Sequence, residues 1–204
     1  MQFSPLVYYQ IFGVMLAVTT IVLDAREKIL ARPLSLIGTV MSFFVYYPAG
    51  LYAKCLLNCL YLVLNVYSWY HWLYGGKHRT LLQVSKTSLI TLMRMLLLGI
   101  LGTFVLGCSL QRLANADLAY WDSLHTVMCL AAQWMLARKK LESWILWIIA
   151  DVMYSVVCYY KGLYLFSGLH TFFIVLAVNG YRTWCRSYLQ QSVATTGTTE
   201  QHIQ

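Results

Sequence analysis

Residues 25–72 read AREKILARPLSLIGTVMSFFVYYPAGLYAKCLLNCLYLVLNVYSWYHW, and residues 137–184, which lie 112 positions later, read ARKKLESWILWIIADVMYSVVCYYKGLYLFSGLHTFFIVLAVNGYRTW. The two stretches align without a gap from a basic loop to a tryptophan. Shared hydrophobicity alone rarely maintains one register over such a length, so we interpret them as an internal duplication. The matching positions are Ala25-Arg26 with Ala137-Arg138, Val40-Met41 with Val152-Met153, Gly50-Leu51-Tyr52 with Gly162-Leu163-Tyr164, Val63-Leu64 with Val175-Leu176, and Trp72 with Trp184.

The composition predicts an all-α integral membrane protein. Of 204 residues, 60% are hydrophobic and 11% are charged, whereas a soluble domain carries about 25% charged residues. A helix of about 20 apolar residues crosses a hydrocarbon layer of about 30 Å. The N-terminal segment lacks the basic region and cleavage site of a secretory signal, so we expect the first span to be retained. Hydropathy predicts spans near 5–23, 33–49, 51–74, 87–110, 118–136, 143–160 and 163–184.

The duplication organises these seven spans into two parallel three-helix repeats and a linker helix. A shift of 112 residues moves the chain along by four spans, and an even number of crossings preserves orientation. Repeats of this kind are typical of transporters, in which the substrate site is expected near the midplane between the copies. The predicted parts are a first repeat at 1–76, a linker with the fourth span at 77–116, a second repeat at 117–188, and a disordered cytoplasmic tail at 189–204.

The net charge of +8 follows the membrane topology rather than a nucleic-acid surface, because the basic residues form short clusters between apolar spans. One side has Lys54, Arg112 and Lys161. The positive-inside rule then places the N-terminus outside and the C-terminus in the cytoplasm. The basic residues on the opposite side are Arg26, Lys28, Arg32, Lys77, Arg79, Lys86, Arg138, Lys139, Lys140, Arg182 and Arg186.

The chemistry-bearing motifs of common enzymes are missing from the sequence. It has no Walker loop, HExxH, GxSxG or dinucleotide fingerprint, and its six cysteines lack metal-ligand spacing. We therefore predict no cofactor and no metal. The spans also lack the ladder of charged groups expected in a proton-coupled pump, so passive transport is favoured. An intramembrane enzyme subunit and a membrane scaffold remain alternatives.

A polar stripe marks the sixth span, with Trp144, Trp147, Asp151, Tyr154 and Cys158 on one helical face. A carboxylate deep in a membrane helix costs about 2.5 kcal/mol or more unless it meets a partner or a wet cavity, so Asp151 indicates an inward-facing surface. Trp147 is favoured as a ligand contact. Trp144 lies near the predicted cytoplasmic end, where interfacial anchoring is an equal alternative.

Three further spans carry polar residues that would face the bundle interior. Such groups often serve only to hydrogen-bond one helix to the next, which is the simpler explanation for Asn58, His125, His170 and Asn179. The fifth span has Asp122, His125, Cys129 and Gln133; the third has Asn58, Tyr61, Asn65 and Trp72; the seventh has His170, Phe173, Asn179 and Trp184.

With these residues in place, the chain resembles the PnuC family of vitamin transporters over residues 10–186. The family pattern is a basic pair, an acidic residue, a WxxW, a D-x-x-Y, a K-G-L-Y and a G-x-x-x-W. The first cytoplasmic loop departs from it at Ala31-Arg32-Pro33-Leu34-Ser35, where an aromatic residue before Pro-Leu-Gly is expected. The segments similar to the pattern are Arg138-Lys139-Lys140, Glu142, Trp144 to Trp147, Asp151 to Tyr154, Lys161-Gly162-Leu163-Tyr164 and Gly180 to Trp184, with Gly50-Leu51-Tyr52 and Trp69 to Gly76 in the first repeat.

The resemblance implies a three-plus-one-plus-three fold like that of SWEET proteins, in a bacterial cytoplasmic membrane. It also implies import of nicotinamide riboside by facilitated diffusion, a cytoplasmic kinase that traps the vitamin, and a trimer. Trp147, with Trp144 or Trp72, would stack on the cationic ring. Gln133, Asn65 and Tyr154 would bind its amide or ribose, and Asp151 would be structural or a counter-charge. Trp69 and Asn179 complete the predicted substrate-binding set.

Thiamine is a second candidate substrate, because it is also a cationic aromatic vitamin. Riboflavin is neutral and bulkier, so its transport would argue against recognition of a cation.

Overall fold

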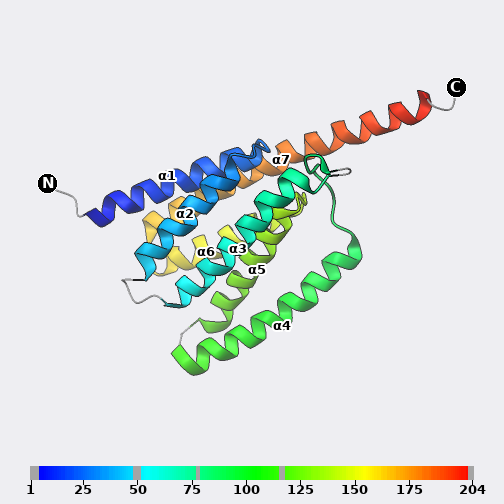
Figure 1. The fold of residues 1–204 in the computed structure, drawn as a ribbon. Helices are drawn as coiled ribbons and strands as arrows, with labels where there is room; N and C mark the ends of the chain where they lie inside the picture. Colours follow the sequence, from blue (N-terminus) through cyan, green and yellow to red (C-terminus); the bar gives the residue numbers. More distant parts are fainter. Residues whose placement is uncertain (1–4, 48–51, 77–78, 115–117, 202–204) are drawn as a thin grey trace. The chain divides into compact units, whose positions relative to one another are not determined.

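The computed structural model describes residues 5–47, 52–76, 79–114 and 118–201. Seven α-helices make up the regular structure of these residues (Figure 1). This confirms the predicted all-α architecture and the number of helices. The chain divides into two compact units, residues 1–82 and 83–204.

The first unit contains three helices, each packed on the next in sequence. Helix α1 spans Pro5–Ala25, α2 spans Ala31–Tyr46, and α3 spans Tyr52–Tyr74. Helix α1 packs on α2, and α2 packs on α3. The turn predicted at Pro48-Ala49-Gly50 lies outside the described residues.

The second unit repeats this three-helix arrangement and adds one helix before it. Helix α4 spans Leu89–Ala114, α5 spans Ala119–Ala137, α6 spans Ser143–Tyr160, and α7 spans Tyr164–Gln201. Again each helix packs on the following one, and α4 lies along α5 (Figure 1). The predicted linker helix thus belongs structurally with the second repeat, although the division into repeats and linker by residue number stays a prediction.

The membrane character is clearest in three helices. Among the described residues, Leu89–Arg112, Ser143–Tyr160 and Tyr164–Val193 are long and apolar enough to cross a bilayer, and shorter apolar helices cover Ile11–Ala25 and Ala31–Phe44. Large apolar side chains of α4, among them Leu96, point away from the protein with about two thirds of their surface exposed. Such a surface is unfavourable in water and is expected where lipid covers it.

The two repeats have the same turn after their first helix. Glu27 and Lys139, at equivalent positions, both have a positive φ, 54° and 47° respectively. The amide of Glu27 donates to the Asp24 carbonyl and that of Lys28 donates to Leu23, which is the Schellman arrangement that ends a helix. Lys139 and Lys140 donate to Leu136 and Met135 in the same pattern. The duplication seen in the sequence is therefore a duplication of backbone structure.

A short extended segment, residues 84–88, precedes α4 and lies against the α5–α6 turn. Its Ser85 amide donates to the Lys139 carbonyl, and the Ser85 carbonyl accepts from the Leu141 amide, both at 3.0 Å. The Glu142 carboxylate accepts bonds from the Thr87 amide and hydroxyl, the latter at 2.7 Å. The linker is thus bonded to the second repeat before α4 begins.

Helix α7 is longer than the sequence analysis predicted. Residues 189–201 continue it as helix, where the polar composition predicted a disordered tail. Extending a helix that has already formed fixes one residue for each added hydrogen bond, whereas starting a new one is costly. A polar segment directly after a membrane helix can therefore remain helical.

Candidate substrate site

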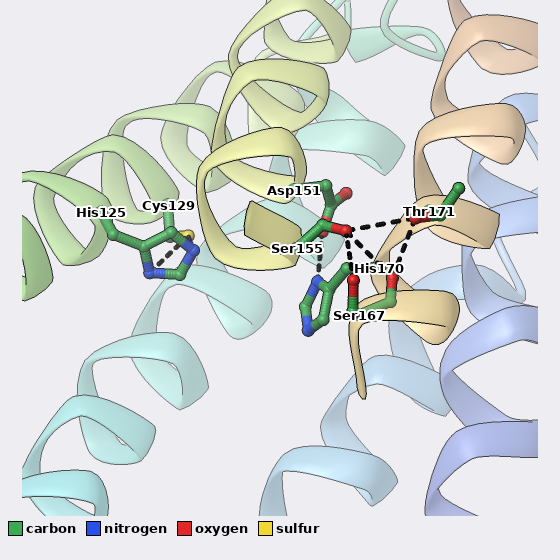
Figure 2. Close-up of polar contacts among 7 residues, drawn as sticks. All are labelled: His125, Cys129, Asp151, Ser155, Ser167, His170 and Thr171. Carbon is green, nitrogen blue, oxygen red and sulfur yellow. Dashed lines mark hydrogen bonds and ion pairs between the residues drawn. The ribbon is translucent and has the colours of Figure 1, made fainter. Parts of the chain in front are cut away.

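The central feature of the second unit is an interaction between Asp151 and His170. Asp151 lies halfway along α6 and is buried, and its Oδ1 is 2.7 Å from Nδ1 of His170 on α7 (Figure 2). A carboxylate inside a membrane helix requires such a partner, because an uncompensated charge there is costly. The prediction that Asp151 marks an inward-facing surface agrees with this position.

Aromatic rings pack against the histidine of this pair. The His170 ring contacts Tyr154 on α6 at a centroid distance of 4.5 Å, and Phe173 on its own helix at 5.6 Å. Tyr154 in turn lies 5.1 Å from the ring of His125 on α5. His125 is also within 3.6 Å of the Cys129 sulfur (Figure 2). Three helices thus contribute polar and aromatic groups to one region.

A hydroxyl cluster fastens α6 to α7 beside the pair. The Ser155 hydroxyl lies 3.0 Å from the Ser167 hydroxyl and 3.1 Å from the Thr171 hydroxyl, and it donates to the Ser167 carbonyl at 3.0 Å (Figure 2). Each hydroxyl can both donate and accept. This cluster fixes the spacing of the two helices that carry Asp151 and His170.

The first repeat has different chemistry at the equivalent positions. Asp151 corresponds to Thr39 and His170 corresponds to Asn58 in the 112-residue register. The Asn58 side chain donates to the Thr39 carbonyl, and Asn65 donates to the Thr39 hydroxyl at 3.0 Å. These contacts join α2 to α3 and confirm the simpler explanation for Asn58, a hydrogen bond between helices. At these two positions the first repeat therefore uses neutral groups.

The ring of Trp144 is enclosed by protein. It meets Trp184 edge-on, with centroids 5.5 Å apart and an interplanar angle of 89°. Its other neighbour is Gly180, where an added Cβ would come within 2.7 Å of three ring atoms. These contacts favour a packing role over ligand stacking for Trp144.

Trp72 is also occupied by a neighbour from its own unit. The Arg32 guanidinium lies over its ring, with Cζ 4.4 Å from the centroid. Arg32 forms an ion pair with Asp24 and donates to the Ser68 hydroxyl at 2.9 Å. The guanidinium thus takes the place on the indole that a cationic ligand would need.

The other predicted site residues differ in exposure. Gln133 is buried on α5, and Trp147 is half-buried on α6 one turn beyond Trp144. Three are exposed: Tyr154, Asn179 and, in the first unit, Trp69. The second unit thus brings together Asp151 and Tyr154 of the predicted set, and Asn65, Trp69 and Trp72 belong to the first unit.

Two histidines lie in this region although neither belongs to the predicted substrate-binding set. For His170 the bond to Asp151 agrees with the expected hydrogen bonding between helices, whereas His125 contacts Cys129 on its own helix and the Tyr154 ring. The sequence does contain a hint of the Asp151–His170 pair, because a histidine and an aspartate in neighbouring spans can form an ion pair. The spacing of residues within one span, however, does not show which residues of the next span they contact.

The charges around the pair disfavour the binding of an anionic ligand. Neither α5, nor α6, nor the part of α7 from residue 164 to 181 contains a lysine or arginine, whereas Asp151 contributes a carboxylate. Phosphate groups are usually bound by arginine or lysine. The region is suited to a cationic or neutral ligand.

These features define a helical membrane protein with two three-helix repeats and a polar, aromatic region inside the second. The sequence matches the model of the nicotinamide mononucleotide transporter family over residues 7–186, and the chain belongs to this family. Its members are transporters rather than enzymes.

Two proteins that are similar to this chain are both named as nicotinamide riboside transporters. The nicotinamide riboside transporters PnuC of Escherichia coli and of Shigella flexneri are each 26% identical over 203 residues, which covers 86% of this chain and 84% of the relative. The crystal structure of the vitamin B3 transporter PnuC superimposes with a TM-score of 0.66 at 18% identity, over 87% of this chain and 80% of that one. That structure shows the same fold.

Proposed function

We propose that this protein imports nicotinamide riboside through the cytoplasmic membrane of a bacterium by facilitated diffusion. A cytoplasmic kinase then phosphorylates the vitamin, which prevents its return. Family membership supports a pyridine nucleoside or nucleotide as the substrate. The observation that carries the choice of the nucleoside is the buried carboxylate of Asp151, beside aromatic rings and in spans without lysine or arginine.

The substrate's charge explains why this observation matters. Nicotinamide riboside carries one fixed positive charge on an aromatic ring, and an aromatic face attracts such a cation by about 0.5–2 kcal/mol. Asp151 supplies the counter-charge. The mononucleotide adds a phosphate, which would meet this carboxylate without a cation to bind it. The unphosphorylated form is therefore favoured.

The roles of individual residues follow from their exposure. Trp147 is only half-buried and stacks on the pyridinium ring, whereas Trp144 and Trp72 support the structure. Gln133 and Tyr154 supply hydrogen bonds to the amide or the ribose. The moderate strength of these interactions suits a carrier, because a ligand that is held too tightly is released slowly.

The orientation and assembly belong to the same proposal. Basic residues gather at the ends of the spans that share a side with the C-terminus, so we place the C-terminus in the cytoplasm and the N-terminus outside. A trimer is proposed from the family resemblance.

Thermal unfolding of the purified protein in detergent tests which substrate binds, because a ligand that binds only the folded state raises stability. Nicotinamide riboside, nicotinamide mononucleotide, thiamine and riboflavin are compared. Stabilisation by the riboside alone is expected. Stabilisation by thiamine alone would change the substrate and keep the cation site. Stabilisation by riboflavin would contradict recognition of a cation, and stabilisation by the mononucleotide would contradict the preference for the unphosphorylated form.

Uptake by cells tests transport itself. Trp147→Ala and Gln133→Ala are expected to lose nicotinamide riboside uptake at normal membrane abundance. Trp121→Ala is the matched control, because this exposed tryptophan of α5 is outside the predicted site. Unchanged uptake in both site variants would overturn the site assignment.

A further inference from the structure

The imidazole of His170 has one nitrogen that is held and one that has no hydrogen-bond partner among the described residues. Nδ1 faces Asp151 at 2.7 Å. An ionised carboxylate only accepts hydrogen bonds, so the proton between them is on Nδ1. In the neutral ring this places a lone pair on Nε2, which can accept a bond. The ring is held in this orientation by Tyr154 and Phe173.

The fold does not require this ionisable pair. At the equivalent positions the first repeat joins α2 to α3 by a bond from the Asn58 side chain to the Thr39 backbone carbonyl, and both residues are neutral. A carboxylate and an imidazole in a membrane span are more costly than a threonine and an asparagine. The second repeat therefore carries chemistry beyond what its packing needs.

We propose that His170, oriented by Asp151, is a specificity-determining residue. Its neutral imidazole accepts, at Nε2, a hydrogen bond from a sugar hydroxyl of a cationic nucleoside. This inference rests on the proposed function, because it takes a cationic nucleoside as the substrate.

Among the described residues, Asp151 and Tyr154 of α6 contact His170, and the hydroxyls of Ser167 and Thr171 on its own helix are bonded to Ser155. From α5, His125 contacts the Tyr154 ring, and Cys129 lies next to it. His125 is thus a second histidine in this region. A test must therefore separate the two histidines.

The test compares the binding of two ligands by the full-length protein in detergent. Nicotinamide riboside and N-methylnicotinamide carry the same charged ring, but only the first has a ribose. The wild-type protein is expected to prefer the riboside by about tenfold, the effect of one well-placed hydrogen bond. His170→Phe should bind both ligands alike. His125→Gln should keep the preference.

A second variant guards against misfolding. His170→Phe leaves the Asp151 carboxylate without its partner, so the double variant Asp151→Thr, His170→Asn installs the neutral pair that the first repeat already uses. It should fold, bind cations weakly and show no preference for the riboside. If either variant folds and retains the preference of the wild type, the inference is overturned and the proposed function stands. If the wild-type protein binds neither ligand, both fail.

Discussion

The Arg32 guanidinium lies over the Trp72 ring at the position where the second repeat has Trp144 edge-on to Trp184. Trp72 and Trp184 are equivalent in the 112-residue register, and so are Arg32 and Trp144. The first repeat therefore covers Trp72 with the Arg32 cation, whereas the second repeat covers Trp184 with the indole of Trp144. The surroundings differ accordingly. Asp24 forms an ion pair with Arg32 and Ser68 accepts its hydrogen bond, whereas the equivalent residues of the second repeat are Leu136 and Gly180.

The Asp24–Arg32 pair yields a prediction about stability. Asp24→Leu removes the partner of a buried arginine and should destabilise the protein by about 3–5 kcal/mol. The triple variant Asp24→Leu, Arg32→Trp, Ser68→Gly copies the second repeat and should recover much of that loss. Thermal unfolding in detergent measures both. A triple variant less stable than the single one would show that the two sets of residues are not interchangeable.

Gly180 should tolerate no side chain. In Gly180→Ala, the new Cβ would lie 2.7 Å from atoms of the buried Trp144 ring, and overpacking of this kind costs about 1–3 kcal/mol. A lower midpoint of thermal unfolding is expected. Gly168→Ala is the matched control on the same helix, because nothing lies within 4 Å of its added Cβ. Equal stability of the two variants would contradict the tight packing of Trp144.

The Asp151 carboxylate should matter for charged ligands only. Asp151→Asn keeps the shape and can still bond to His170, but it removes the counter-charge. We expect the affinity for nicotinamide riboside to fall about tenfold or more, which corresponds to at least about 1.4 kcal/mol. Isothermal titration of the purified variant measures this. Unchanged affinity would show that Asp151 is only structural.

Removal of the Glu142 carboxylate should release the extended segment 84–88 from the turn between α5 and α6. Glu142→Ala deletes the acceptor of the Thr87 amide and hydroxyl. Trypsin should then cleave after the exposed Lys86 about tenfold faster, because local opening becomes easier. Glu142→Gln retains an acceptor and should cleave at nearly the wild-type rate. Equal cleavage of all three proteins would contradict the role of Glu142.

The helix order and the repeat were predictable because both depend on properties that run along the chain. Apolar length determines the spans, and an ungapped register identifies the copies. The structure adds that Glu27 and Lys139 adopt the same left-handed conformation. Neither residue is a glycine, so composition gave no sign of that turn. Repetition of the flanking sequence was the informative signal.

Partners across helices were much less predictable. Asp151 and His170 were each recognised as polar residues facing the interior, yet their pairing depends on how α6 crosses α7. Arg32 was counted among the basic residues that set the topology, whereas the structure buries it in an ion pair. Its role depends on Asp24, which lies in the preceding helix, and hydropathy does not show such a pairing.

The Schellman turns have a consequence for biogenesis. Each closes through bonds among residues that are at most five positions apart, from Leu23 to Lys28 and from Met135 to Lys140. In both units, moreover, every helix packs on its successor. A helical hairpin can therefore form as soon as its second helix leaves the translocon, before the other half of the protein has been synthesised. Folding in the membrane would then proceed vectorially, with each new helix added to a partner already in place.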